Sequence, residues 1–433
     1  MTESNRTDVR TSASRRDFLK GSAAAVVSGS LAATLGAARM AHAAADGVLK
    51  VGLIGCGGRG SGAAVNAMNA DPNVKLTAMG EVFADRLTQA RGVLQRQLGD
   101  KYAVTDDCAF SGFDAYKGVI DSGVDVVLLA EPPHFRPRHL RYAIEQGKHV
   151  FCEKPVAVDG PGVRHVLETT EMAKEKKLNL VSGLCWRYDY GVRETMKRIL
   201  DGAIGDIVAM QEDYLTGVLW HRGREPQWSE MEYQLRNWYY FTWLSGDHNV
   251  EQHIHSLDKS LWLMNDQPPA KCFGLGGRQV RVEEQWGNIY DHFAVCYQWP
   301  NGVNTFAYTR QMKGCSNEVE DYVWGTKGRA RILANTVEGP EGSWKYDGPK
   351  ASMYDIEHQE LFAGLRKGEI INNGVYMSYS TLLAIMGRMA CYTGQEVTWD
   401  KALNSQENLS PEKYEWGDVK IPTVAMPGVT KFI

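Results

Sequence analysis

Six residues near the start of the chain, Gly55-Cys56-Gly57-Gly58-Arg59-Gly60, match the pattern G-x-G-x-x-G between an apolar run and a helix-like stretch. Such glycines allow a tight turn, the close approach of backbone to a pyrophosphate, and close packing of the helix on the strand. Free N–H groups at the start of the helix bind phosphate oxygens. The motif predicts dinucleotide binding, with Gly55, Gly57, Gly58, Arg59 and Gly60 at the cofactor.

An acidic residue follows this motif at the distance that a ribose contact requires. The next apolar run, VKLTAMGE, ends at Glu81. A carboxylate there accepts hydrogen bonds from the adenosine ribose hydroxyls and repels a 2′-phosphate. We therefore expect NAD as the cofactor, while Arg86 close by leaves NADP open.

A second group of residues that could do chemistry lies in the segment NVEQHIHSLDKSLWLM, residues 249–264. If the segment is one helix, residues spaced by three or four share a face: Glu251, His255, Asp258 and Trp262. His253 then points roughly opposite His255. His248, His253 and His255 raise the alternative of a metal site, but a helical H-x-H cannot bind one ion from a shared face. We expect no metal.

Elements that would position these residues alternate between apolar runs and helical patterns. The runs from Val48, Val74, Gly123 and Lys148 predict a parallel sheet in a βαβ arrangement. Ligands bind beyond the carboxyl ends of such strands. The residues that follow the third and fourth runs are therefore expected at the cofactor: Pro132, His134, Glu153 and Lys154.

The remainder of the chain predicts a second domain with long neighbouring strands. These strands are expected over residues 205–215, 271–282, 291–300 and 303–312, with a hairpin at Pro300-Asn301-Gly302 and a helix near 374–392. The segment KLNLVSGLCWRYDY, residues 177–190, is expected to begin this domain with a strand. The fold class is α/β: an N-terminal Rossmann domain with a doubly wound parallel sheet over 46–165, then an α+β domain with a large, mostly antiparallel open sheet over 166–433.

The first 43 residues have the pattern of an export signal. Arg15-Arg16 precedes a mild apolar run over 21–39, and Ala41-His42-Ala43 offers a cleavage site. The paired arginines resemble a twin-arginine signal, so we expect the twin-arginine export machinery as a partner and a periplasmic or secreted location. A membrane anchor is the alternative, because the run barely reaches spanning length. No later apolar stretch reaches that length, so no membrane span is expected in the mature protein.

Composition excludes several classes of protein. The 433 residues are 43% hydrophobic and 23% charged, as in soluble globular proteins, and their number favours two domains. A net charge of −4 gives no electrostatic basis for binding nucleic acid. The eight cysteines form no C-x-x-C pair, which argues against a zinc ribbon or a redox dithiol.

Aromatic residues gather in the segment from His221 to Gly246. They are Trp228, Tyr233, Trp238, Tyr239, Tyr240, Phe241 and Trp243, with three arginines among them. Aromatic rings pack on the C–H faces of sugars, and arginines bind sugar hydroxyls. We interpret the segment as a lid over a carbohydrate substrate; the alternative is that most of these rings belong to a hydrophobic core.

Together these motifs resemble the glucose–fructose oxidoreductase and inositol dehydrogenase family (Gfo/Idh/MocA). The matching residues are the three motif glycines, Glu81, Pro132-Pro133-His134, GKHVFCEKP at 147–155 and GDHNVEQHIHSLDKSLWLM at 246–264. The resemblance implies oxidation of a sugar CH–OH group with NAD(P), and a homodimer or homotetramer formed through the open sheet face. The chain departs from the family where Glu251 replaces a usual Asp, His253 a common Gly and Glu131 a frequent Thr or Asn.

The resemblance assigns Lys154, Glu251 and His255 to the reacting carbon. Oxidation of an alcohol needs a base for the hydroxyl proton while hydride leaves, and histidine has a pKa near neutrality. Lys154 would hold or shuttle that proton, and Glu251 would orient or relay it. The residues expected to contact the substrate are Arg187, Trp238, Tyr239 and His253.

An exported enzyme cannot draw on cytosolic NAD, so we expect a tightly held cofactor that is reduced and reoxidised within one cycle. One such chemistry oxidises a sugar and reduces another. The other oxidises the 3-hydroxyl of a glycoside, eliminates the aglycone, adds water and returns the hydride, which is net hydrolysis. A third alternative is a non-catalytic protein that binds NAD and a sugar.

Overall fold

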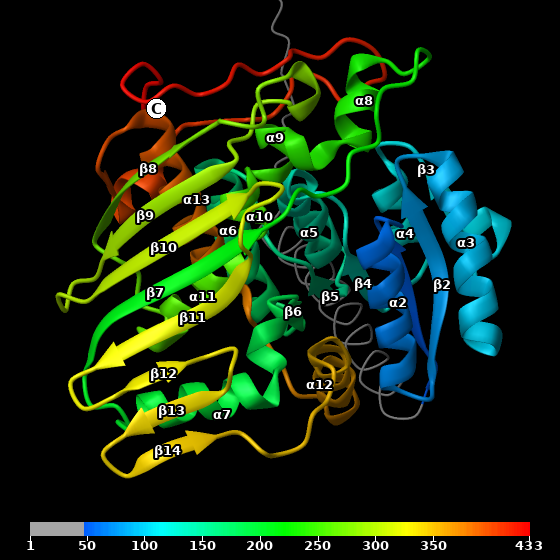
Figure 1. The fold of residues 1–433 in the computed structure, drawn as a ribbon. Helices are drawn as coiled ribbons and strands as arrows, with labels where there is room; N and C mark the ends of the chain where they lie inside the picture. The colour runs from blue at the N-terminus through cyan, green and yellow to red at the C-terminus, as the bar shows by residue number, and fades with distance from the viewer. Residues whose placement is uncertain (1–46) are drawn as a thin grey trace, which may run out of the picture.

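The computed structural model describes residues 47–433, so the predicted export signal lies outside the described residues. Two sheets stand side by side in Figure 1, a smaller one on the right and a larger one on the left. We call residues 47–184, which build the smaller sheet, the N-terminal part, and residues 185–433 the C-terminal part. In the part of the chain that the structure describes, no helix is both long and apolar enough to cross a membrane.

The N-terminal part is a parallel sheet of six strands in the order β3-β2-β1-β4-β5-β6. Its strands are β1 Leu49–Ile54, β2 Val74–Glu81, β3 Ala109–Ser111, β4 Val126–Leu129, β5 His149–Cys152 and β6 Leu180–Ser182. Its helices are α2 Gly58–Ala70, α3 Ala84–Leu98, α4 Ala115–Asp121, α5 Arg136–Glu145 and α6 Gly160–Glu175. The strand order reverses between β1 and β4, where ligands bind in such sheets. The predicted doubly wound sheet is confirmed.

One strand lies in a different sheet from the one expected. β6 does not begin the second sheet, because Val150, Phe151 and Cys152 of β5 pair with Leu180, Val181 and Ser182 of β6 in parallel. All of β6 is buried, and it forms the edge of the first sheet. The parallel sheet therefore extends beyond residue 165.

The C-terminal part is a sheet of nine strands in the order β14-β13-β12-β11-β7-β10-β9-β8-β15. Its strands are β7 Ile207–Thr216, β8 Lys271–Gly277, β9 His292–Gln298, β10 Asn304–Gln311, β11 Glu318–Gly325, β12 Arg329–Arg331, β13 Thr336–Gly339, β14 Gly342–Lys345 and β15 Val397–Thr398. Neighbours are antiparallel except β7 and β10, which are parallel. The predicted, mostly antiparallel sheet is confirmed, and β11 to β14 extend it beyond the predicted strands.

Helices cover one face of this sheet and fill the space between the two sheets (Figure 1). They are α7 Tyr190–Leu200, α8 Glu230–Arg236, α9 Thr242–Ser245, α10 His248–Glu251, α11 Ile254–Leu263, α12 Met353–Lys367, α13 Gly374–Thr393 and α14 Trp399–Asn404. The predicted helix near 374–392 is α13, which is buried along nearly its whole length because it contacts α6 on one side and β8 and β9 on the other. α12 packs on α2 of the N-terminal part.

A buried ion pair holds α11 on the sheet. Lys259 is 1% exposed, and its Nζ lies 2.7 Å from a carboxylate oxygen of Asp321 on β11. The same ammonium donates a hydrogen bond to the carbonyl of His255, at 2.7 Å. Ser260 donates to Glu212 on β7, and burial together with Asp321 raises the pKa of Glu212 to about 8. The position of His255 therefore depends on charges buried beneath the sheet.

Replacing this lysine tests how much the ion pair contributes. Lys259→Met leaves the Asp321 carboxylate buried without its cation, so we expect the free energy of unfolding to fall by about 3–5 kcal/mol. Urea unfolding followed by tryptophan fluorescence measures the change. In the matched control, Lys197→Met removes a solvent-exposed pair with Asp201 and leaves the unfolding midpoint unchanged. Equal stability of the two variants would contradict a charged network under α11.

Candidate active site

The glycine motif forms a turn that is tight at its ends and open in its middle. Gly55 has a φ of +87°, and a Cβ on Gly60 would lie 1.9 Å from the carbonyl oxygen of Gly55. A Cβ on Gly57 or Gly58 would meet no atom within 4 Å. α2 begins at Gly58, so its first N–H groups face this open space. The arrangement fits the close approach of a phosphate to the backbone.

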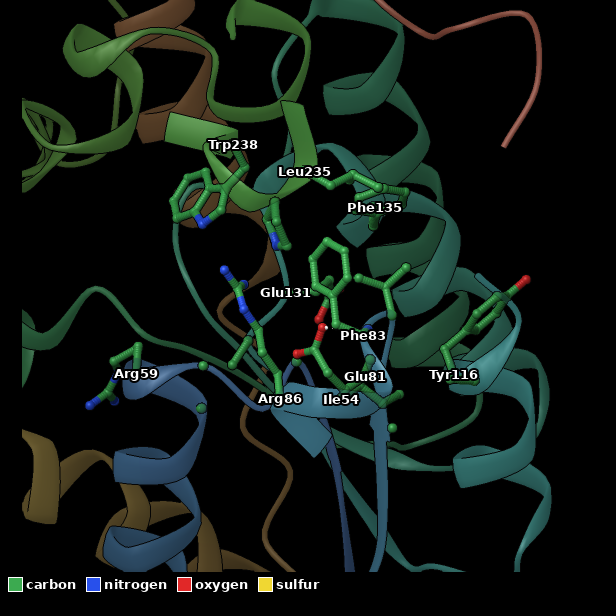
Figure 2. Close-up of a pocket in the computed structure, with 18 of the residues that line it drawn as sticks. Ile54, Arg59, Glu81, Phe83, Arg86, Tyr116, Glu131, Phe135, Leu235 and Trp238 are labelled. Atoms are coloured by element: carbon green, nitrogen blue, oxygen red, sulfur yellow. Dashed lines mark hydrogen bonds between the residues drawn. The ribbon is translucent and has the colours of Figure 1, made fainter. Parts of the chain in front are cut away.

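A cavity of about 430 Å³ lies against this turn, at the carboxyl ends of β1, β2 and β4 (Figure 2). Its walls in the N-terminal part include the motif residues Gly55, Gly57, Gly58, Arg59 and Gly60 together with Glu81, Phe83, Arg86, Phe113 and Pro132. Trp220, Arg222, Leu235 and Trp238 of the C-terminal part close it from the other side. Its volume and mixture of apolar side chains and backbone amides suit a dinucleotide. We call it the cofactor cavity.

Glu81 lies at the edge of this cavity, at the end of β2. Its carboxylate accepts hydrogen bonds from the backbone N–H of Cys56, at 2.9 Å, and of Phe83, at 3.2 Å. Arg86 lies in the same wall, and burial together with the nearby Arg222 lowers its pKa. One carboxylate and two arginines therefore face the end of the cavity where a ribose would bind.

His134 lies apart from the cofactor cavity that Pro132 lines. Its buried ring forms a 2.8 Å hydrogen bond with the hydroxyl of Tyr414, and burial lowers its pKa to about 3. The short helix at Pro133–Phe135 turns this side chain toward the C-terminal segment. Most of the residues predicted at the cofactor line the cofactor cavity, but His134 does not, and Glu153 and Lys154 line a neighbouring cavity instead.

A second cavity of about 260 Å³ adjoins the first, since Arg59, Glu131 and Trp238 line both. We call it the substrate cavity. It is lined by Arg59, Glu131, Arg136, Glu153, Lys154, Cys185, Tyr214, Trp238, Glu251, Gln252, His255 and Tyr354. The three residues expected at the reacting carbon, one from the N-terminal part and two from the C-terminal part, thus line one cavity.

An ion pair joins the two parts of the chain at this cavity. Nζ of Lys154 donates to the carboxylate of Glu251 at 2.9 Å and also to its backbone carbonyl. The two side chains are 12% and 14% exposed, so the pair is largely shielded from water. Glu251 therefore fixes the direction in which the Lys154 ammonium points.

His255 is positioned as a neutral base. Burial, with the positive charges of Lys154, Lys259 and Arg59, lowers the pKa of its imidazole well below 6.5. At neutral pH the ring therefore carries no charge and can accept a proton.

The helix expected over 249–264 is interrupted. α10 ends at Glu251 and α11 begins at Ile254, with Gln252 and His253 between them. Asp247 has a φ of +78°, and its carboxylate accepts hydrogen bonds from the N–H groups of His248 and Tyr290. Glu251 and His255 still line one cavity across the interruption.

Three residues expected to contact substrate lie outside the substrate cavity. His253 is fully buried, bonds Asn249 at 3.1 Å, and has its pKa lowered to about 3 by burial. Arg187 pairs with Asp258 and Asp266. Tyr239 is fully buried, and its hydroxyl accepts a hydrogen bond from Gln311 at 2.7 Å. Each of these side chains is held by contacts within the C-terminal part.

The aromatic segment is mostly core. Its buried rings form one cluster: Tyr233, Tyr239, Tyr240, Phe241 and Trp243. Trp238 is different, because it lines both cavities. For this residue the position agrees with the interpretation of the segment as a substrate lid. The alternative of a hydrophobic core therefore describes most of the segment.

Several residues in or beside the two cavities were not predicted, among them Tyr214, Gln252, Tyr354 and Glu357. Tyr214 comes from β7 and Gln252 from the interruption before α11, where Gln311 donates to its amide oxygen at 2.7 Å. Arg59 donates to Glu357 of α12 at 2.8 Å and lies over the ring of Tyr354 at 4.4 Å. Gln252 lies within the motif at 246–264, so the sequence could have indicated it. Tyr214, Tyr354 and Glu357 come from elements without a motif.

Known proteins are similar to this chain in sequence. Residues 49–184 match the family described as "Oxidoreductase family, NAD-binding Rossmann fold". The 2,7-anhydro-N-acetylneuraminate hydratase of Escherichia coli (strain K12) is 26% identical over 327 residues, which are 75% of this chain and 77% of that protein. The inositol 2-dehydrogenase of Salmonella typhimurium (strain LT2) is 25% identical over 360 residues, 80% of this chain and 94% of that protein.

Solved structures show the same fold. Levoglucosan dehydrogenase in complex with NADH and levoglucosan superposes with a TM-score of 0.63 at 20% identity, over 81% of this chain and 99% of that one. At 20% identity this likeness is one of fold.

Substitutions in the glycine turn separate dinucleotide binding from folding. Gly57 has a φ of −71°, which any residue adopts, and its Cβ direction is free. We therefore expect Gly57→Val to keep its melting temperature but to bind NADH at least about tenfold more weakly, a loss of about 1.4 kcal/mol. Thermal unfolding and NADH fluorescence titration measure the two effects.

Two matched variants complete this test. Gly60→Ala places Cβ against the Gly55 carbonyl and is expected to lower the melting temperature. Gly62→Ala lies in the same helix, where a Cβ would find Arg59 Nη1 at 3.9 Å, and is expected to bind NADH normally. Normal NADH affinity of Gly57→Val would show that the dinucleotide binds elsewhere.

Proposed function

The chain belongs to the Gfo/Idh/MocA family of NAD-binding oxidoreductases, and from that membership we propose that it oxidises a CH–OH group of a sugar or sugar derivative. The observation that carries the proposal is the junction of the two cavities. A cavity suited to a dinucleotide adjoins one lined by Lys154, Glu251 and His255, with Arg59 and Trp238 in the walls of both.

The residues at this junction divide the work of an alcohol oxidation. When bound, the dinucleotide accepts the hydride from the substrate carbon. Neutral His255 takes the hydroxyl proton. Lys154, directed by Glu251, donates a hydrogen bond to the oxygen on which negative charge develops. The first N–H groups of α2 would hold the pyrophosphate, and Glu81 the adenosine ribose.

We take NAD as the dinucleotide. The carboxylate of Glu81 is almost buried at the end of β2, where a 2′-phosphate would meet its negative charge. Arg86 and Arg222 lie close enough to offset part of this repulsion, so they are the residues through which NADP would bind.

Export and cofactor retention are part of the same proposal. The twin-arginine pattern at Arg15-Arg16 supports export to the periplasm or secretion, away from the cytosolic NAD pool. A dinucleotide that stays bound and is reoxidised in each cycle makes such a location workable. The enclosure of the cofactor cavity by four side chains of the C-terminal part supports retention.

A redox-neutral reaction on a sugar is the second candidate. The similarity to the E. coli protein named 2,7-anhydro-N-acetylneuraminate hydratase favours it, because adding water leaves the net oxidation level unchanged. Transient oxidation of a sugar hydroxyl beside Lys154 and His255, followed by elimination and return of the hydride, would use the same cavity. A non-catalytic binding role is disfavoured by the neutral base and the directed ammonium in that cavity.

The outer face of the nine-stranded sheet supports assembly of copies of the chain. Side chains of β8 and β10 expose Phe273, Leu275, Phe306 and Tyr308 on this face. Large apolar side chains exposed on one face are typical of surfaces that bind another protein. We propose a homodimer or homotetramer formed through this face.

The first experiment is to purify the protein without added cofactor, denature it and assay the supernatant for NAD(H) and NADP(H). We expect about one NAD(H) per chain, because each chain has one glycine turn of this kind. The products formed from candidate sugars without added NAD then distinguish the two reactions. One oxidised and one reduced sugar indicate exchange between two sugars, whereas a product at the oxidation level of the substrate indicates the redox-neutral reaction. An empty protein that consumes added NAD stoichiometrically would overturn the closed cycle. Bound NADP(H) would overturn the assignment of Glu81.

The pH dependence of sugar oxidation tests the base. The neutral imidazole is the active form, and a lowered pKa keeps His255 neutral as the pH falls through 6.5. We therefore expect a constant rate of cofactor reduction between about pH 6.5 and 7.5, with the acid limb below that range. Single-turnover absorbance at 340 nm, the NADH band, follows the reduction.

Substitution of the same residue gives the magnitude. His255→Ala is expected to slow reduction by about 10²- to 10⁴-fold, the usual contribution of a general base. His165→Ala, on α6 outside the substrate cavity, is the control and should react at the normal rate. An acid limb centred at or above pH 6.5, or a small effect of His255→Ala, would assign the proton to another group.

A further inference from the structure

The chain beyond α14 forms a long extended segment, residues 405–433, which lies across both parts of the molecule (Figure 1, in red). Its two ends meet, because Ser405 Oγ and the N–H of Gln406 both donate to the carbonyl of Ile433, at 2.6 and 3.1 Å. We call this segment the strap.

The middle of the strap packs on the walls of the cofactor cavity from outside. The ring of Trp416 lies 4.9 Å from that of Phe113 and 5.6 Å from that of Phe83, measured between centroids. Phe83 and Phe113 both line the cofactor cavity. Tyr414 adds the hydrogen bond to His134, and the N–H of Leu409 donates to Asp159 at 3.0 Å. The strap thus contacts the N-terminal part at several points, and two of these contacts are on walls of the cofactor cavity.

The same stretch binds the C-terminal part where that part covers the cavity. We call Trp220, Arg222, Leu235 and Trp238 the roof. The N–H of Gly417 donates to Ser229 Oγ at 3.2 Å, and the N–H of Met231 donates to the Gly417 carbonyl at 3.0 Å. Ser229 caps α8, the helix that carries Leu235 into the roof. Trp416 and Gly417 therefore connect a cavity wall to the start of α8, the helix that carries Leu235 into the roof.

A direct contact also joins α8 to the N-terminal part. Arg236, at the end of α8, bonds the carboxylate of Asp85 at 3.1 Å, and its guanidinium lies 4.1 Å from the centre of the Phe83 ring. Asp85 is largely exposed, so this pair alone is a weak fastening. The strap adds ring packing and backbone hydrogen bonds at the same seam.

We propose that the strap clamps the roof over the cofactor cavity, and that Trp416 sets how fast a bound dinucleotide leaves. A molecule enclosed between walls from one part and a roof from the other departs when the two separate. Trp416 is a positioning residue, since it acts through Phe83 and Phe113. The inference rests on the proposed function, in which the dinucleotide is retained between turnovers.

The test measures release of NADH from the full-length protein. Protein loaded with NADH is mixed with excess NAD⁺, and the loss of bound-NADH fluorescence gives the rate constant of release. Trp416→Ala is expected to release NADH about tenfold faster, since two ring contacts are lost. Trp416→Phe, which keeps a ring, should show a smaller increase. Val429→Ala changes an exposed side chain of the strap away from this seam and should release at the wild-type rate.

The outcomes separate this inference from the proposed function. Equal release rates for wild type and Trp416→Ala would overturn the clamp, whatever the rates are. Rapid release from the wild type would overturn cofactor retention, while the ratio of the two rates would still report on the strap. Circular dichroism and the melting temperature of NADH-free protein show whether Trp416→Ala is folded. Should it fail to fold, Trp416→Phe and Tyr414→Phe carry the test, and a wild-type rate in both would overturn the clamp.

Discussion

The ion pair between Lys154 and Glu251 is the interaction on which the site depends. Lys154 follows β5 of the first sheet, and Glu251 ends α10 of the second part, so the pair forms when the two parts are closed on one another. A partly buried pair of this kind costs desolvation and contributes little net stability. Its effect is geometric, because it aims an ammonium into the cavity. Arg59 and Glu357 repeat the arrangement beside it, again with one partner from each part.

Next to this ion pair, the C-terminal part holds His253 in the interior and His255 at the substrate cavity. The backbone bends at Asp247, whose carboxylate also accepts a hydrogen bond from Tyr392, and the helix is interrupted after Glu251. The interruption sends His253 into the interior and leaves His255 at the cavity. Lys259, anchored to Asp321, holds the carbonyl of His255. Burial lowers the pKa of the His255 ring most, and the positive charges of Lys154 and Lys259 lower it further. The same lysine thus contributes both to the position of His255 and to its low proton affinity.

Local patterns predict much of this molecule, and non-local contacts account for what they miss. The glycine turn, the strands β1, β2, β4 and β5 of the first sheet, and α13 follow from residue type and period, which act over a few residues. The short strand β3 was not predicted. The turn at Asp247 is held by Tyr290 and Tyr392, far along the chain, and the helical period extends without a break through the interruption at Gln252. β6 has a strand pattern in either sheet, and pairing with β5 decides its place. Tyr354 of α12 and the strap residues beside the cofactor cavity carry no motif, because their position is set by packing on the N-terminal part.

In the proposed reaction, cofactor and substrate reach the junction from different sides. Arg59 and Tyr354, in the wall of the substrate cavity, are about one-third exposed, so this cavity meets solvent beside α12. The strap and α8 cover the cofactor cavity at the other end of the boundary between the two parts (Figure 1). A closed redox cycle requires this separation, since sugars must exchange in every turnover while the dinucleotide stays. Trp238 lies in the walls of both cavities, so the roof that encloses one ligand also shapes the pocket of the other.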